Sequence, residues 1–296
     1  MNTIIRDPKL LFAPATVQVD HRVDGSRVLR SPMALGPVPA KLGEHLERWA
    51  AEAPERTFLA ERGADGEWVR LSYAETLARV RAVGTWLLGQ NLSVNRPVVV
   101  LSDNSVEHAV LMLAAMHVGV PVSPVSPAYA LLDHSGARLR HVMELLTPGL
   151  VFADDGAAFG PAIGRAVPAD TELVLLRGEA EGRACTRFAD LLRTPPTPAV
   201  DAAHAAVNAA TVAKFIFTSG STNLPKAVVN THGMLCSNMQ MHNQCYPFMV
   251  DEPPVMVDWL PWHHTAGGNV VFGLALVNGG TLYIDHGKPT DAGIAQ

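Results

Sequence analysis

The sequence predicts an α/β protein in which mainly parallel sheets are flanked by helices. Short apolar runs of strand length alternate along the chain with amphipathic helical segments, which is the pattern of parallel strands joined by helical crossovers. Hydrophobic residues make up 48% of the 296 residues and charged residues 17%, which is a globular composition that suffices for a large core. The 24 glycines and 22 prolines predict many turns between the elements.

Apolar side chains recur at helical spacing in five places. They predict helices near residues 42–53, 77–88, 106–117, 138–146 and 231–244. Ser72 stands three residues before Glu75, just ahead of the second segment, and the pair predicts a capping box. Asp103 or Asn104 is expected to cap the third helix, and Gly119 is expected to end it.

Apolar runs between these helices have strand length. They predict strands at residues 97–101, 120–122, 150–153, 172–176, 215–217, 255–260 and 281–285. Residues 193–210 read as a linker, because proline and then alanine replace large apolar residues there. We therefore expect an irregular segment over residues 1–40, a first α/β subdomain over 41–205, and the start of a second over 206–296.

Charge and cysteine content exclude several classes of protein. A net charge of -5 gives no general attraction to nucleic acid or to an anionic membrane surface. The chain has no secretory signal pattern at its start, and no apolar run approaches the roughly 18 residues that span a bilayer. The three cysteines, Cys185, Cys236 and Cys245, are odd in number and lack paired spacing, which predicts a reducing, cytoplasmic setting.

A polar loop follows the strand expected at residues 215–217. Its hydroxyls, glycine and lysine can supply hydrogen bonds and positive charge to a polyphosphate. The candidate phosphate-binding residues are Thr218, Ser219, Gly220, Ser221, Thr222 and Lys226. Pro225 stands where the common nucleotide loop has glycine, so this is not that P-loop. On residue types alone, a Ser/Thr-rich surface turn explains the segment equally well.

Another polar cluster follows the strand expected at residues 255–260. Trp262, His263, His264 and Thr265 come at the carboxyl end of that strand, where α/β sheets place ligands. Adjacent side chains on extended backbone point to opposite faces, so we expect His263 and His264 not to share a metal ion. The sequence therefore predicts no metal site, and a structural role remains open for at least one histidine.

The segment FTSGSTNLPKAVV resembles the phosphate-binding signature of the AMP-forming adenylating enzymes, which include acyl- and aryl-CoA synthetases. It departs at Asn223 and Ala227, where glycine is usual in that family. Asn tolerates positive φ better than other non-glycine residues, whereas Ala227 implies a conformation without that requirement. The stretches LSYAE and LPWHHTAGGN resemble further elements of the family. The longer stretch LPWHHTAGGNVVFGLALVNGGTLYIDHGKPT is most similar to the branch of the family that includes feruloyl-CoA synthases.

The resemblance implies that residues 218–222 and Lys226 hold the phosphates of ATP. It also implies that Trp262, His264 and Thr265 border the acyl group, with Mg2+ as cofactor and CoA as co-substrate. The resemblance further implies that the catalytic lysine lies in a C-terminal domain, which we expect these 296 residues not to include. No catalytic residue is therefore assigned in this chain.

The chain ends at Gln296, about half the length that the resemblance implies for a complete enzyme. We therefore expect the incomplete N-terminal domain of a carboxylate:CoA ligase, inactive alone, acting on a feruloyl-like aromatic or another carboxylic acid. Its expected partners are that small carboxylate and the missing C-terminal half or a second copy of the chain. Two alternatives stay open: a non-catalytic product of a truncated or split gene, and a peptide-synthetase-type adenylation domain.

Overall fold

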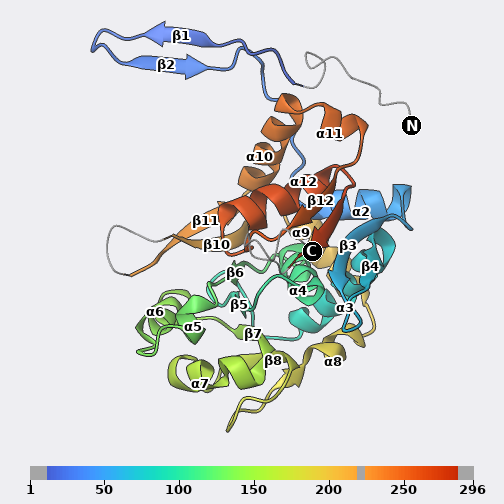
Figure 1. Ribbon diagram of the computed structural model, residues 1–296, viewed down its shortest axis with the longest axis vertical. Coiled ribbons are helices and arrows are strands. Elements are labelled where there is room, and N and C mark those ends of the chain that lie inside the picture. Colours follow the sequence, from blue (N-terminus) through green and yellow to red (C-terminus); the bar gives the residue numbers. More distant parts are fainter. Residues whose placement is uncertain (1–11, 219–223, 286–296) are drawn as a thin grey trace.

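The computed structural model describes residues 12–218 and 224–285 (Figure 1). Its larger sheet has seven strands in the order β11-β10-β6-β5-β7-β8-β9, and every pair is parallel except β10 with β11. The strands are β5 (Val98–Leu101), β6 (Val122–Pro124), β7 (Leu150–Asp155), β8 (Glu172–Arg177), β9 (Thr186–Arg187), β10 (Val212–Thr218) and β11 (Lys226–Thr231). The predicted α/β class with mainly parallel sheets is confirmed.

Helices cover both faces of this sheet, which explains why its central strands are continuously apolar. Val98 and Val100 of β5 belong to one core cluster, whereas Val99 and Leu101 belong to another. The first cluster contains side chains of α3 (Tyr73–Leu88) and α4 (Val106–His117). The second contains side chains of α6 (Ala137–Leu146) and α7 (Gly156–Ala166). Alternate residues of one strand therefore pack against opposite helical layers.

The smaller sheet joins segments from near the two ends of the described chain. Its order is β12-β13-β3-β4, and only β3 with β4 is antiparallel. The strands are β3 (Thr57–Arg62), β4 (Trp68–Ser72), β12 (Val255–Asp258) and β13 (Thr281–Ile284). Figure 1 shows β3 and β4, in blue, beside the red C-terminal elements. Both sheets take strands from either side of residue 205, so the predicted subdomain division does not follow the sheets and stays a prediction.

The starts of two helices differ in how well the sequence predicted them. Helix α3 begins at the predicted capping box, in which Glu75 N donates to Ser72 Oγ at 3.2 Å and Ser72 N donates to Glu75 Oε2 at 2.8 Å. For α4 the predicted cap was wrong: Ser105 accepts from His108 N at 3.0 Å, because Asn104 is engaged elsewhere. Gly119 follows the helix at a φ of 77°, as its predicted stop requires.

Several elements were missed from the sequence. A hairpin of β1 (Gln18–His21) and β2 (Arg27–Arg30) lies within the segment expected to be irregular. Helix α9 (Pro198–Ala206) lies within the expected linker, because its alanines are good helix formers and Pro198 occupies the first turn. The remaining helices are α2 (Gly43–Glu52), α5 (Ala128–Leu131), α8 (Phe188–Leu192), α10 (His232–Cys245), α11 (Phe248–Asp251) and α12 (Phe272–Val277). Over residues 12–218 and 224–285, the helices are too short or too polar to span a bilayer.

Candidate functional site

The candidate phosphate loop is carried by the β10–β11 hairpin at one edge of the large sheet (Figure 1). Thr218 pairs with Lys226 at the end of the ladder next to the loop, and both residues are exposed. The Nε2 atom of His141, on α6, lies 3.0 Å from the carbonyl oxygen of Pro225. This end of the hairpin therefore presents a hydroxyl and an ammonium to solvent beside the loop.

Four predicted phosphate-binding residues fall outside the described residues: Ser219, Gly220, Ser221 and Thr222. Lys226 was expected within the loop, but it is the first residue of a strand that the sequence pattern did not predict. Ala227 lies in that strand opposite Phe217, so its backbone needs no positive φ. The departure from glycine at Ala227 is therefore compatible with the local structure, whereas Asn223 lies outside the described residues.

The second candidate cluster lies in a turn that follows β12. Trp262 is buried in the core, where its ring lies 5.1 Å from those of His108 and Phe272. His264 and Thr265 are exposed, and His263 is half-buried. Of the three predicted acyl-bordering residues, two thus face solvent and Trp262 packs beneath the surface.

The expectation that His263 and His264 point to opposite faces was wrong. His264 N donates to Pro261 O at 3.0 Å, so the backbone turns here instead of remaining extended. The two imidazole rings consequently lie 4.4 Å apart. Burial, together with the neighbouring His264, lowers the pKa of His263 to about 4, so its ring is neutral at pH 7.

The turn is attached to the end of β5 by Asn104. The side chain of Asn104 donates to Leu260 O at 2.9 Å and accepts from Trp262 N at 2.9 Å. Asn104 is nearly buried, and buried polar groups need hydrogen-bond partners. This one segment supplies a partner for the amide nitrogen of Asn104 and another for its amide oxygen. This role was missed because the sequence offered Asn104 only as a helix cap.

A π-helix, η1 (Ala266–Val271), follows the histidines and packs closely against the chain before them. A Cβ atom on Gly267 would lie 2.4 Å from Leu260 O, and one on Gly268 would lie 2.1 Å from Trp262 O. Only glycine therefore permits this approach of two backbones. Gly268 N also donates to His264 O at 2.9 Å, which connects η1 to the exposed histidine.

A buried lysine in β10 contacts the same π-helix. Lys214 is 1% exposed, and its Nζ donates to Gly268 O at 2.6 Å and lies 3.4 Å from Asn269 Oδ1. Asn269 in turn donates to Asn230 Oδ1, on β11, at 3.3 Å. Burial lowers the pKa of Lys214 to about 7. A lysine inside the apolar run of β10 was the signal that could have identified this residue from the sequence.

The two candidate clusters are joined at the base of the hairpin. Lys214 and Asn230 are cross-strand partners, and both reach Asn269. Thr218 lies four residues beyond Lys214 along β10, or roughly 13 Å at the rise of a strand. The structure thus places η1 at the base of the hairpin and the described phosphate-loop residues at its opposite end.

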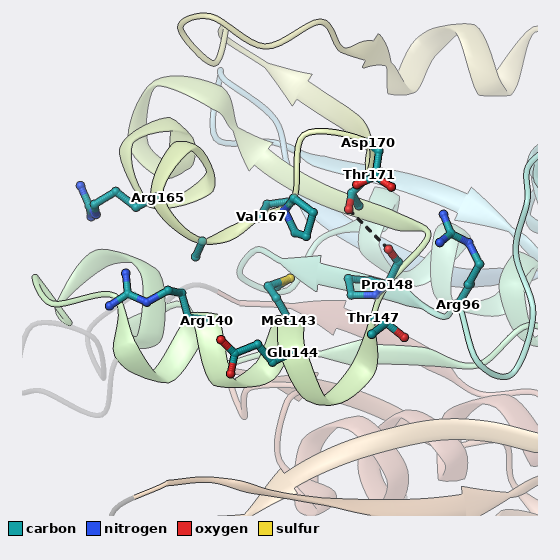
Figure 2. Close-up of a pocket in the computed structure, with 12 residues that line it drawn as sticks. Arg96, Arg140, Met143, Glu144, Thr147, Pro148, Arg165, Val167, Asp170 and Thr171 are labelled. Atoms are coloured by element: carbon teal, nitrogen blue, oxygen red, sulfur yellow. Dashed lines mark hydrogen bonds between the residues drawn. The ribbon is translucent and has the colours of Figure 1, made fainter.

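A cavity lies elsewhere in the described part of the chain. Figure 2 shows this cavity of about 530 Å3, in which Thr171 Oγ1 lies 3.5 Å from Pro148 O. Pro148 and Thr171 precede β7 and β8, so the cavity lies at the amino ends of these strands. The described candidate residues do not line it, and ligands of α/β sheets usually bind at the opposite, carboxyl ends.

Within the described ranges, one group of three side chains has atoms that could ligate a metal ion: Glu47, His117 and His204. This group does not include His263 or His264. The rings of His117 and His204 are stacked 3.7 Å apart at an angle of 1°. A metal lies in the plane of an imidazole that ligates it, so one ion cannot lie in both of these parallel planes. We therefore assign no metal to this group.

Comparison with known proteins identifies the family. The profile of a family described as "AMP-binding enzyme" matches residues 46–295, which include both candidate clusters. The chain belongs to this AMP-binding enzyme family. Residues 219–222 and Lys226 thus lie in the matched region, although the match assigns no role to an individual residue.

Relatives of this AMP-binding chain include CoA ligases. One relative is the 3-[(3aS,4S,7aS)-7a-methyl-1,5-dioxo-octahydro-1H-inden-4-yl]propanoyl:CoA ligase of Rhodococcus jostii (strain RHA1). The two sequences are 27% identical over 261 residues, and the alignment covers 82% of this chain and 47% of the relative. This chain is 28% identical over 200 residues to a salicylyl-CoA synthase / salicylate adenylyltransferase of Streptomyces sp, covering 64% of this chain and 34% of that protein. The chain therefore spans about half the length of the Rhodococcus relative and a smaller share of the Streptomyces relative.

Solved structures show the same fold. The ATP-bound MatB of Rhodopseudomonas palustris superposes with a TM-score of 0.59 at 24% identity, over 82% of this chain and 45% of that one. At this identity the likeness establishes the fold alone. Neither curated relative is named for ferulate, so the predicted feruloyl specificity stays a proposal.

Proposed function

We propose that this chain is the N-terminal, nucleotide-binding part of an ATP-dependent, AMP-forming carboxylate:CoA ligase. The observation that carries the proposal is the attachment of η1, through Lys214 and Asn269, to the hairpin that bears the candidate phosphate loop. This attachment connects the hairpin of the proposed nucleotide side with the turn of the proposed acid side. The family match over residues 46–295 supports adenylate-forming chemistry there.

The described residues fit the nucleotide side chemically. Lys226 supplies an exposed ammonium and Thr218 an exposed hydroxyl, the donors that a triphosphate requires. Together with the hydroxyls of residues 219–222, they would hold the β- and γ-phosphates while pyrophosphate departs from the α-phosphorus. When bound, Mg2+ would compensate phosphate charge, and we assign it no ligand among these residues.

The acid side is formed by the turn after β12. An acid of the proposed class is ionised at neutral pH and needs no general base before it attacks the α-phosphorus. His264 and Thr265 are exposed and would border its acyl group, while Trp262 packs behind them in the core. An aromatic, feruloyl-like acid is the substrate proposed, and the salicylate-activating relative supports an aromatic ring. CoA would then accept the acyl group.

The experiment that tests the nucleotide assignment is calorimetric titration of the chain with Mg-ATP. Lys226→Ala should weaken binding by about tenfold, which corresponds to about 1.4 kcal/mol and is typical of a lost charge-assisted hydrogen bond. Lys226→Arg retains the charge and serves as the matched control. Equal affinity in Lys226→Ala and the parent would support an ordinary surface turn instead.

Turnover separates the remaining alternatives. Pyrophosphate release and acyl-CoA formation would be measured with ferulate, ATP and CoA. ATP binding without turnover is compatible with two alternatives: a chain that requires a C-terminal half, and a non-catalytic product of a truncated or split gene. Adding the corresponding C-terminal part of a CoA ligase relative separates those two, because only the first should then form acyl-CoA. Adenylation that never transfers the acyl group to CoA would favour the peptide-synthetase alternative.

A further inference from the structure

Lys214 is an unusual residue for the centre of a strand. Its side chain is 1% exposed, and its Nζ lies 5.9 Å from the centroid of the Phe272 ring. Burial of an ammonium is costly unless hydrogen bonds compensate it, and replacement of such a group by an apolar one is often neutral or stabilising. Packing alone therefore does not explain a lysine here.

The hydrogen-bond partners of the Lys214 side chain lie in η1, beside the candidate site. Gly268 and Asn269, which it contacts, lie in η1 directly after the exposed His264. Asn269 extends the contact to Asn230, on the strand that leaves the phosphate loop. Both strands of the hairpin are thereby connected to one turn of π-helix, a helix type that is frequent at functional sites.

Another buried lysine provides the comparison. Lys41 is 9% exposed and also donates its Nζ to a backbone carbonyl, that of His204. That carbonyl belongs to α9, which contains no residue of either candidate cluster. The two lysines thus share burial and bonding, but only Lys214 connects the hairpin with η1.

We propose that Lys214 is a positioning residue whose Nζ holds η1 against the phosphate hairpin and so fixes His264 relative to bound ATP. The part that concerns ATP and the acid rests on the proposed function, whereas the attachment of η1 does not. Loss of Lys214 should let η1 and His264 shift, while Thr218 and Lys226 remain at the other end of the hairpin. Acid binding should consequently suffer more than ATP binding.

The buried histidines near Lys214 are separable from it by pH. The charge of Lys214 contributes to lowering the pKa values of His108, on α4, and His232, on α10. Burial is the main cause, and it lowers them to about 3 and about 4; the pKa of His263 is also about 4. The pKa of Lys214 itself is about 7. The exposed His264 also lies beside η1, because Gly268 N donates to its carbonyl, so a transition at η1 is assigned to Lys214 by its loss on substitution.

The first experiment needs no ligand. The amide signals of Gly268 and Asn269 would be followed by NMR between pH 5.5 and 9 in the parent chain, in Lys214→Met and in Lys41→Met. We expect a transition near pH 7 in the parent, in Lys41→Met and in the additional control His264→Gln, and its loss or clear reduction in Lys214→Met. A transition that is undiminished in Lys214→Met, absent from His264→Gln or missing from the parent would overturn the attachment.

The second experiment measures dissociation constants for Mg-ATP and for ferulate in the same variants. Lys214→Met should weaken ferulate binding at least fivefold and change ATP binding less than twofold, whereas Lys41→Met should change neither. Equal losses of both ligands, or of ferulate in Lys41→Met as well, would show general destabilisation and refute positioning. Should the parent bind neither ligand, the proposed function fails, while the NMR result still decides the attachment.

A milder variant keeps the test decisive if Lys214→Met does not fold. Asn230 is half-exposed on the edge strand β11, so Asn230→Ala should fold. It removes the outer link of the same network, and we expect about a twofold loss of ferulate affinity with ATP affinity unchanged. No change in ferulate binding and no shift at Asn269 would count against the network.

Discussion

The two ends of the candidate site are built in contrasting ways. At the hairpin end, Thr218 and Lys226 are exposed. At the histidine end, the backbone before η1 lies against two glycines, where Asn104 holds that backbone and Lys214 holds η1 by hydrogen bonds. The comparison indicates that Thr218 and Lys226 are accessible to a ligand, whereas packing against the core determines the backbone conformation at the acid side. Substitutions should therefore affect affinity at the first end and folding stability at the second.

The largest effect is expected from Gly268→Ala. Its Cβ would lie 2.1 Å from Trp262 O, and backbone cannot give way as a flexible side chain can. We expect a loss of about 3 kcal/mol in the free energy of unfolding, or failure to fold, measured by urea denaturation.

Gly164→Ala is the matched control for this substitution. Gly164 lies in α7, and a Cβ there would meet no atom within 4 Å. Alanine should stabilise that helix by about 0.5–1 kcal/mol. Similar results for both variants would contradict the close packing of η1.

Asn104→Ala should have the next largest effect. The substitution removes a donor and an acceptor from a nearly buried side chain and leaves Leu260 O and Trp262 N without these partners. We expect a loss of about 2 kcal/mol in urea denaturation. Asn95→Ala is a control on an exposed asparagine, and its stability should stay within about 0.5 kcal/mol of the parent.

Sequence reasoning succeeded where local pattern determines the structure. The run Val98–Leu101 is apolar at every position, which predicted a strand covered on both faces, and the Ser72–Glu75 pair predicted the start of α3. It failed where contacts between distant residues decide. The turn at His263 and His264 depends on packing of η1 against segment 260–262 and on Lys214, 54 residues before Gly268 in the chain. Periodicity cannot report such contacts, so extended backbone was expected there.

The candidate site was accessible to sequence reasoning in part. The family signature identified the hairpin loop and the histidine segment, but not Asn104, Asn230 or Asn269, because asparagine has no single expected role. Strand β11 was also missed. Its Val228 and Val229 are exposed at the edge of the sheet, and the strand is defined by its pairing with β10. Such pairing depends on register with a neighbour and leaves little local pattern.

A pH-dependent effect should distinguish the buried end of the site from the exposed end. The pKa of Lys214 is about 7 in the folded chain, against the ordinary lysine value of 10.5 that applies to the unfolded chain. Between these values the unfolded chain binds more protons, so the free energy of unfolding should rise as the pH increases from 7 toward 10.5. The same gain should be lost as the pH is lowered from 10.5 to 7, and Lys214 should have little further effect below 7. Urea denaturation at pH 6.5, 8 and 9 would measure this rise.

Lys214→Met should flatten that rise, and Lys226→Met should preserve it. The buried histidines contribute in a separate window, below their ordinary pKa of 6.5, because their folded pKa values lie at about 3 to 4. An unchanged pH profile in Lys214→Met would show that its ammonium is not desolvated in solution.

The smallest effect on stability is expected at the exposed end. Lys226 is exposed at the start of β11, so Lys226→Ala should change the free energy of unfolding by less than about 0.5 kcal/mol. The same substitution should weaken Mg-ATP binding about tenfold, and thus separate affinity from folding at this one position. A loss of stability comparable to that of Asn104→Ala would mean that Lys226 supports the fold. The contrast between an open phosphate end and a packed acid end would then be wrong, because both ends would depend on the same core.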